Sequence, residues 1–346
     1  MTIGKETIDW LFKEQLKVDA KWSMRVPSGF IWWPYQHAQT IKIAGEEVGP
    51  DGEIAYLISI RTDVLQSLEL DDRAVSLIGA SIMPFASMAG VVYDAVHRTL
   101  NLCSLVRVHA GIAKWMRPII SVAAILQINE AQSMAVGLAQ AMNATAATSA
   151  HPTNGNRPEP DEMAQLVPGL VKPIGREPCK WQAEEFQDAV DDYMQGPPSL
   201  MANGGGLGFT VEFPYGGFSS LCQAKGDQPH SIYGNGLFVR QVFPVRGYSD
   251  IQGARLAMSL NESELVTRPS GYGFGSYVFR DNAVSFVSFY PNAMYRPGLL
   301  PNIYYSCAQR AQAMSESLAN SEWTKDSFDS GQTAMGHVLK RARGNT

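Results

Sequence analysis

The 346-residue sequence lacks the patterns that mark secreted, metal-binding and membrane-spanning proteins. Its four cysteines are scattered and form no CxxC pair, whereas disulfide frameworks and zinc sites need close or paired cysteines. The longest mainly apolar run, Ile119 to Ile128, is far shorter than the roughly 18 residues of a membrane span. Charged residues interrupt the N-terminal segment, which therefore does not resemble a signal peptide. We expect free thiols, no membrane partner and a cytoplasmic location.

Basic charge is also scarce. The net charge is -5, from 28 Lys and Arg against 33 Asp and Glu, and the only basic cluster is Lys340, Arg341 and Arg343. Nucleic-acid binding needs a wider basic stripe than three residues near one terminus. We therefore expect no nucleic-acid partner.

Recognisable catalytic and cofactor motifs are missing as well. The six histidines never occur as HxH, HExxH or HxxxH, and no GxSxG motif is present. The glycine-rich stretch Asn203 to Gly208 leads into a predicted strand rather than a helix, so it does not resemble a phosphate-binding loop. His230 is the most interesting histidine because it lies on a predicted loop, but Gly226, Asp227 and Pro229 favour a plain turn there. We expect no enzyme activity, no cofactor and no metal.

What the sequence does contain is a set of paired segments in the same order in its two halves. Gly29 to Tyr35 and Gly208 to Tyr215 both begin with Gly-Phe and end with Pro-Tyr. Later pairs are Thr40–Ile43 with Ser220–Gln223, Gly52–Ile60 with Gly234–Val242, and Ile119–Asn129 with Asn282–Asn292. The order of these pairs predicts an internal duplication.

Periodicity indicates helices around the predicted strands. Apolar residues at helical spacing predict a helix at the start and another at the end of each half, and middle helices are expected near 87–99 and 250–260. The sequence thus predicts an α+β protein of two tandem units, each ordered helix, three strands, helix, two or three strands, helix, with antiparallel sheets. The expected domains are a first unit at 1–143, a Pro-rich linker at 144–180, a second unit at 181–320 and a polar C-terminal extension at 321–346.

Two surfaces stand out as candidate contacts. Strand alternation places Phe30 and Trp32 on one face and Trp33 and Tyr35 on the other. The segment Ile119–Ile128, taken as a strand, is apolar on both faces, and both faces then need cover. The residues expected at an inter-unit or partner contact are Trp33, Tyr35, Val122, Ala124 and Leu126.

The predicted element order resembles the small α+β fold of type III secretion chaperones and the related YbjN-like proteins. The resemblance covers most of both halves and implies a protein-binding role, with the two units forming a pseudo-dimer in one chain. We therefore expect a non-enzymatic chaperone-like or adaptor protein of the bacterial cytoplasm whose partner is another protein. Alternatives are a structural subunit of a larger assembly, including a homo-oligomer, and an enzyme or small-ligand binder with a pocket between the units.

Overall fold

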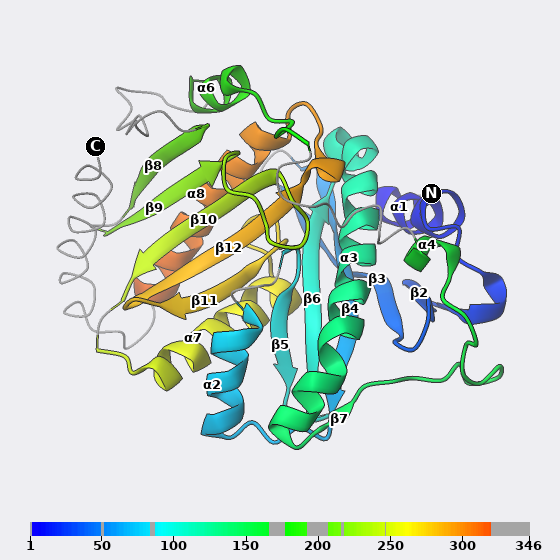
Figure 1. Ribbon diagram of the computed structural model, residues 1–346. Coiled ribbons are helices and arrows are strands. Elements are labelled where there is room, and N and C mark those ends of the chain that lie inside the picture. Colours follow the sequence, from blue (N-terminus) through cyan, green and yellow to red (C-terminus); the bar gives the residue numbers. More distant parts are fainter. Residues whose placement is uncertain are drawn as a thin grey trace. The chain divides into compact units, whose positions relative to one another are not determined.

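The chain forms two compact α+β units with antiparallel sheets (Figure 1). The computed structural model describes residues 2–49, 52–83, 87–165, 177–191, 207–215, 218–245 and 247–319. The first unit takes in Met1–Leu170 and Met258–Ser276, and the second takes in Val171–Ala257 and Tyr277–Thr346. The segment 258–276 thus joins the first unit, although the sequence assigned it to the second. The predicted extension 321–346 lies outside the described residues.

The first unit is built on a sheet with strand order β1-β2-β3-β4-β6-β5, to which the short β7 adds by pairing with β4. The helices are α1 (Ile3–Trp10), α2 (Asp72–Ser81), α3 (Ala110–Met142) and α4 (Glu162–Gln165), with a π-helical turn, η1, at Leu11–Gln15 and a 3₁₀ turn, η2, at Ala20–Trp22. The strands are β1 (Ser23–Val26), β2 (Gly29–Trp32), β3 (Gln39–Val48), β4 (Ile54–Gln66), β5 (Gly90–Asp94), β6 (Thr99–Val108) and β7 (Thr145–Ala146).

The segment Ile119–Ile128 is helical, so its assignment as a strand is wrong. It forms the middle of α3, whose flanking stretches were not joined to it in the sequence interpretation. A short apolar run cannot be distinguished from a buried strand by periodicity alone, because a helix buried on most sides is apolar all round. In Figure 1, α3 runs along the strands of the first sheet.

The length and composition of α3 would also allow it to cross a membrane, which the sequence interpretation missed by reading only its central run. One 18-residue stretch of this helix is apolar enough to cross a membrane, but 67% of that stretch is buried inside the protein. The core helix of a folded unit shows the same composition. The helix is therefore weak evidence for a membrane span.

The middle helix expected near 87–99 is also wrong. Those residues form β5 and the turn into β6, and the middle helix is α2, which starts earlier in the chain. Asp71 caps it, because its carboxylate accepts a hydrogen bond from Ala74 N at 2.7 Å. The adjacent acids Asp71 and Asp72 thus mark a helix start, where an N-cap and negative charge are both favourable.

The second unit has the sheet order β11-β12-β10-β9-β8. Its strands are β8 (Gly208–Tyr215), β9 (Phe218–Lys225), β10 (Gly236–Pro244), β11 (Ser276–Arg280) and β12 (Ala283–Pro291). Its helices are α6 (Ala183–Asp191) and α8 (Leu299–Ala319), with a 3₁₀ turn, η5, at Asn292–Met294. Helix α7 (Asp250–Glu262) begins in this unit and ends in the first, to which the π-helical turn η4 (Ser263–Thr267) belongs. In Figure 1, α8 lies behind the strands of the second sheet.

The two sheets follow the same path through the chain. The order β2-β3-β4-β6-β5 in the first unit matches β8-β9-β10-β12-β11 in the second, with a helix before, between and after the strands in each. Gly29 pairs with Lys42, and Gly208 pairs with Lys225. A Cβ at Gly29 would lie 2.1 Å from the carbonyl oxygen of Ile41, and one at Gly208 would lie 2.2 Å from that of Ala224. The same close approach of backbones thus occurs at the start of both strands.

A buried glutamine joins sheet to helix in each unit. In the first, Gln39 Nε2 donates to the carbonyl oxygen of Ala124 in α3 at 2.9 Å, and Trp32 Nε1 donates to Gln39 Oε1 at 3.0 Å. In the second, Gln241 Nε2 donates to the carbonyl oxygen of Cys307 in α8 at 2.8 Å. Because an unpaired buried amide is costly, these bonds fix the helix against the sheet.

The segment 258–276 completes the outer face of the first sheet. Leu265 is fully buried and forms a small apolar cluster with Val92 and Cys103 of β5 and β6. Beyond the end of β5, Gly273 exchanges backbone hydrogen bonds with Leu105 of β6, at 3.1 and 3.2 Å. The first unit therefore consists of two separate parts of the chain, Met1–Leu170 and Met258–Ser276.

Candidate functional site

Trp33 is buried against the chain that follows α3, which we call the connector and define as residues 144–165. Its exposed fraction is 4%, and its indole Nε1 donates to Ser149 Oγ at 3.1 Å. The ring of His151 meets the Trp33 ring edge-on, with centroids 4.8 Å apart. The connector belongs to the same unit, so the indole of Trp33 is buried without any contribution from the second unit or from a partner protein.

Backbone pairing holds the connector on the end of the sheet. Ala147 N donates to Val64 O at 2.9 Å, and Asp161 N donates to Pro34 O at 2.7 Å. Between these points, Arg157 donates to the carbonyl oxygen of Trp33 and forms a 2.9 Å ion pair with Asp161. Both charged side chains are nearly buried, so the pair is well shielded from solvent. The sequence signals for this region, its prolines and Thr153-Asn-Gly-Asn156, indicated turns but not where they would pack.

The remaining predicted contact residues are distributed differently from the expectation. Tyr35 is half-buried in the bend after β2. Ala124 and Leu126 are fully buried in α3, while Val122 is half-buried. Residues two positions apart on a helix point in different directions, so these three do not form the single face that a strand would give them.

Among the described residues, the two sheets differ at one edge. In the first unit, β1 pairs antiparallel with β2, from Ser23 opposite Trp32 to Val26 opposite Gly29. The guanidinium of Arg25 in β1 lies 3.7 Å from the Phe12 ring centroid. In the second unit, the described strands end at β8, the counterpart of β2. The positions that correspond to β1 by register are 202–205; they lie outside the described residues, and their sequence Ala-Asn-Gly-Gly has no β-branched or aromatic residue.

The edge strand β8 is firmly supported from inside its unit. Phe209 packs edge-on against Phe186 of α6 and Tyr304 of α8, with ring centroids 6.1 and 5.6 Å apart. Burial raises the pKa of Tyr304 to about 12, so its hydroxyl stays protonated at neutral pH. A strand held in this way presents its outer backbone in a fixed, extended form.

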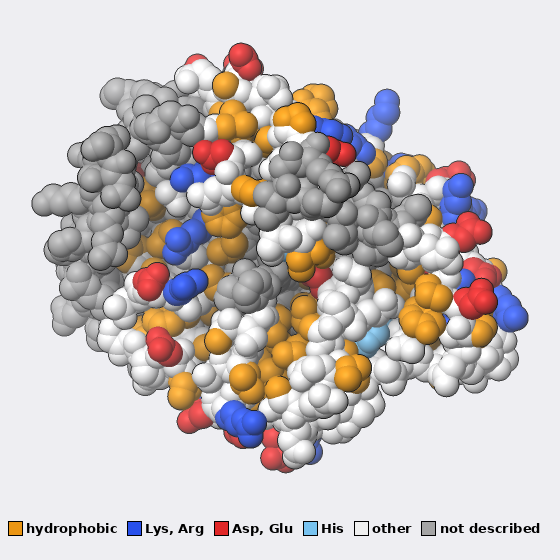
Figure 2. Space-filling view, viewed as in Figure 1, with side chains coloured by type: hydrophobic (Ala, Val, Ile, Leu, Met, Phe, Trp, Pro, Cys, Tyr) orange, Lys and Arg blue, Asp and Glu red, His pale blue; other side chains and the backbone are white. Residues whose placement is uncertain are grey.

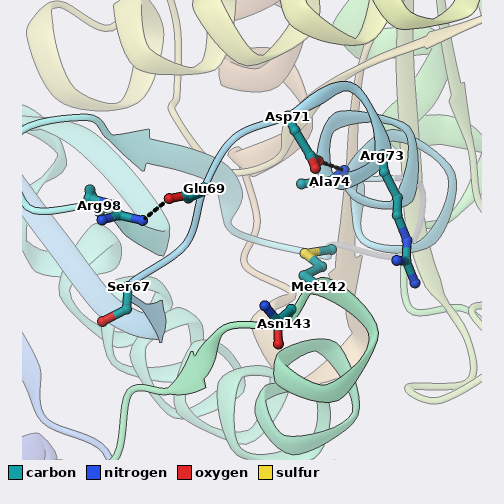
Figure 3. A pocket seen from close by; sticks show the side chains of 8 residues that line it. All are labelled: Ser67, Glu69, Asp71, Arg73, Ala74, Arg98, Met142 and Asn143. Carbon is teal, nitrogen blue, oxygen red and sulfur yellow. Dashed lines mark hydrogen bonds and ion pairs between the residues drawn. The ribbon is translucent and has the colours of Figure 1, made fainter.

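A polar pocket of about 450 Å³ lies in the first unit, between the start of α2, the β5–β6 turn and the end of α3 (Figure 3). Its lining residues are Ser67, Glu69, Asp71, Arg73, Ala74, Arg98, Met142 and Asn143. Figure 3 shows the ion pair between Arg98 and Glu69, 2.9 Å long, on the opposite side from Arg73. Among the described residues Arg73 has no ion-pair partner. The lining holds equal numbers of acids and arginines, so it favours no single charge of ligand.

Titratable groups cluster at the β5–β6 turn without forming a recognisable active site. Asp94 accepts from His97 Nδ1 at 2.8 Å and from two backbone amides of the turn, and these bonds lower its pKa to about 2. Burial raises the pKa of the Cys103 thiol to about 12, which makes it a poor nucleophile. Within the described residues, no group of three or more His, Cys, Asp or Glu side chains is placed to hold a metal ion.

The visible face in Figure 2 carries Lys and Arg side chains interspersed with Asp and Glu, without one continuous basic field. Comparison of the chain with protein-family models, with curated proteins and with solved structures finds no match. The functional argument therefore rests on the geometry of the two units.

Proposed function

We propose that the protein is a non-enzymatic, chaperone-like adaptor that binds an extended segment of another protein along the outer edge of β8. The observation that carries the proposal is the difference between two otherwise matching sheets. The first unit covers the edge of β2 with its own strand β1, whereas the described part of the second sheet ends at β8. An edge strand offers backbone donors and acceptors to any segment that can pair with it.

The resemblance to type III secretion chaperones and YbjN-like proteins supports a binding role. The described elements from α6 to α8 have the order helix, three strands, helix, two strands, helix on which that resemblance is based, and the first unit adds β1 before β2 and β7 after α3. Two such units in one chain are what a duplicated chaperone unit would give, and we include that duplication in the proposal. A bacterial cytoplasmic location is part of the same proposal.

A graft of the first unit's own edge strand tests the docking edge. Replacing residues 202–207 with Ser-Met-Arg-Val-Pro-Ser, the sequence of 23–28, keeps the spacing to Gly208 that β1 has to Gly29. We expect the graft to pair with β8 and to abolish capture of the partner from the native cell. A matched variant carrying a Gly-Ser repeat of equal length should still capture it. Capture that survives the graft, with the β8 amides shown by hydrogen exchange to be newly protected, would refute docking at this edge.

The alternative of a structural subunit predicts a different result in the same experiment. If a second copy of the chain pairs along β8, light scattering will give a mass of twice 37.8 kDa for the native protein, and the graft will reduce it to one chain. A native protein that is already monomeric removes this alternative.

A further inference from the structure

Two loops, one in each unit, have the same local structure around a histidine. Their sequences are His151-Pro-Thr-Asn-Gly-Asn and His230-Ser-Ile-Tyr-Gly-Asn. In each, the histidine and the glycine four positions later exchange backbone hydrogen bonds of 2.8–3.0 Å. The glycines have φ angles of 72° and 69°, a left-handed conformation that glycine adopts without strain. The loops do not occupy equivalent positions in the two units, so the likeness is local.

The imidazole closes each loop through one nitrogen. His151 Nδ1 lies 3.2 Å from Thr153 N and 3.1 Å from Asn154 N, and both amides donate to it. His230 Nδ1 accepts in the same way from Ile232 N at 3.1 Å and Tyr233 N at 3.3 Å. A nitrogen that accepts hydrogen bonds carries no proton, so each ring is neutral with its proton on Nε2.

The ring of His151 is buried between two tryptophans. The ring has an exposed fraction of 7% and meets Trp22 and Trp33 edge-on, with centroids 6.0 and 4.8 Å away. Its buried Nε2 has no acceptor among the described residues. The cations nearest the Trp22 ring are Lys21 and Arg157, each 5.7 Å from its centroid.

The acids near this site are already engaged. Asp161 pairs with Arg157 at 2.9 Å, and Asp19 lies 3.7 Å from the same guanidinium. Asp19 also caps the turn before β1 by accepting from Lys21 N. Both carboxylates thus already have a partner among the described residues.

We propose that His151 is a proton-operated latch that releases the connector from the end of the first sheet under mildly acidic conditions. Protonation adds a hydrogen to Nδ1, which removes both hydrogen bonds from the loop and places a positive charge on a buried ring beside Trp22 and Trp33. The loop then opens, Ser149 leaves the indole of Trp33, and the apolar end of β2 becomes accessible. The stabilising contribution is present while the ring is neutral and is lost when the ring takes up a second proton.

The test compares two substitutions during a titration from pH 8 to pH 5. His151→Asn keeps a side-chain acceptor for the backbone amides of an Asx turn but cannot titrate in this range. His151→Ala removes the acceptor at every pH. In the wild type, we expect tryptophan emission to shift to longer wavelength at pH 5. The protection factors of the Thr153 and Asn154 amides, which compare each exchange rate with that of an unfolded chain at the same pH, should fall at least tenfold. The Asn variant should show neither change, and the Ala variant should have low protection factors throughout.

His230→Asn is the matched control in the other loop and should leave the tryptophan transition unchanged. An Asn variant that titrates like the wild type would overturn the proposal. Equal protection of the wild-type Thr153 and Asn154 amides at pH 8 and pH 5 would overturn it too. Nitrogen-15 NMR of the wild-type ring gives a result that needs no variant, because a proton found on Nδ1 at pH 8 would contradict the latch.

Discussion

At the scale of single residues, the burial of Trp33 determines whether its indole serves stability or binding. Trp33→Ala removes a ring that is 4% exposed together with a hydrogen bond to Ser149, and should cost about 3–5 kcal/mol of unfolding free energy. Trp33→Phe keeps a ring against His151 and should cost much less. Chemical denaturation followed by circular dichroism measures both. A Trp33→Ala protein as stable as the wild type would show that the connector does not hold this ring in solution.

The sequence predicted that Trp33 and Tyr35 leave β2 on the side away from Phe30, but could not show what covers them. The connector covers Trp33, and its position depends on tertiary hydrogen bonds to Pro34 and Trp33 rather than on any local sequence pattern. Turn residues such as Asn154 and Gly155 predict that the chain bends and leave open where it packs.

At the scale of elements, the paired glycines make a prediction about both sheets. Gly29→Ala and Gly208→Ala each place a methyl group within 2.2 Å of a backbone oxygen on the neighbouring strand, so each should cost about 1–3 kcal/mol or more. Gly137→Ala is the matched control, because it lies in α3 with nothing within 4 Å and should stabilise the helix by about 0.5–1 kcal/mol. Thermal unfolding distinguishes the three. Equal effects at Gly29 and Gly137 would contradict the close strand approach.

The elements that the sequence predicted well are those with strong local signals. The Gly-Phe pairs of the sequence lie at the start of β2 and of β8, whereas Pro34 and Tyr35 follow the end of β2. The prediction failed at α3, where an apolar stretch was separated from its own flanks. It also failed in aligning the later strands of the two halves. In the structure Thr62 pairs with Gln39, and Gln241 pairs with Cys222. The matching strand segments are therefore offset by three positions from those that the sequence paired, Gly52–Ile60 with Gly234–Val242. Hydrogen-bond register is a long-range property that a single sequence does not display.

At the scale of the whole molecule, the sequence predicted the α+β class and the element order of the second unit. It assigned all of 181–320 to that unit, whereas 258–276 belongs to the first. Leu265 shows why: its apolar partners, Val92 and Cys103, lie far away in sequence, and only the fold brings them together. Local periodicity cannot report such contacts.

Leu265 therefore provides a test of this division. Leu265→Ala should destabilise the first unit by about 2–5 kcal/mol, as a fully buried large-to-small change does. Hydrogen exchange should accelerate in β5 and β6. Val266→Ala, at a neighbouring side chain that is 49% exposed, should have little effect. Acceleration confined to β8, β9 and β10 would assign the segment to the other unit.

The late arrival of 258–276 has a consequence for synthesis. When the ribosome has made residue 170, the chain of the first unit is still missing the segment that covers β5 and β6. At roughly 5–20 residues per second, residue 276 follows about 5–20 s later. During that interval the nascent first unit exposes an apolar surface around Val92, and residues 258–276 must reach it after they are made. The first unit therefore cannot finish folding before synthesis of the second has begun. A ribosome that stalls between residues 170 and 276 leaves an incomplete first unit exposed to aggregation.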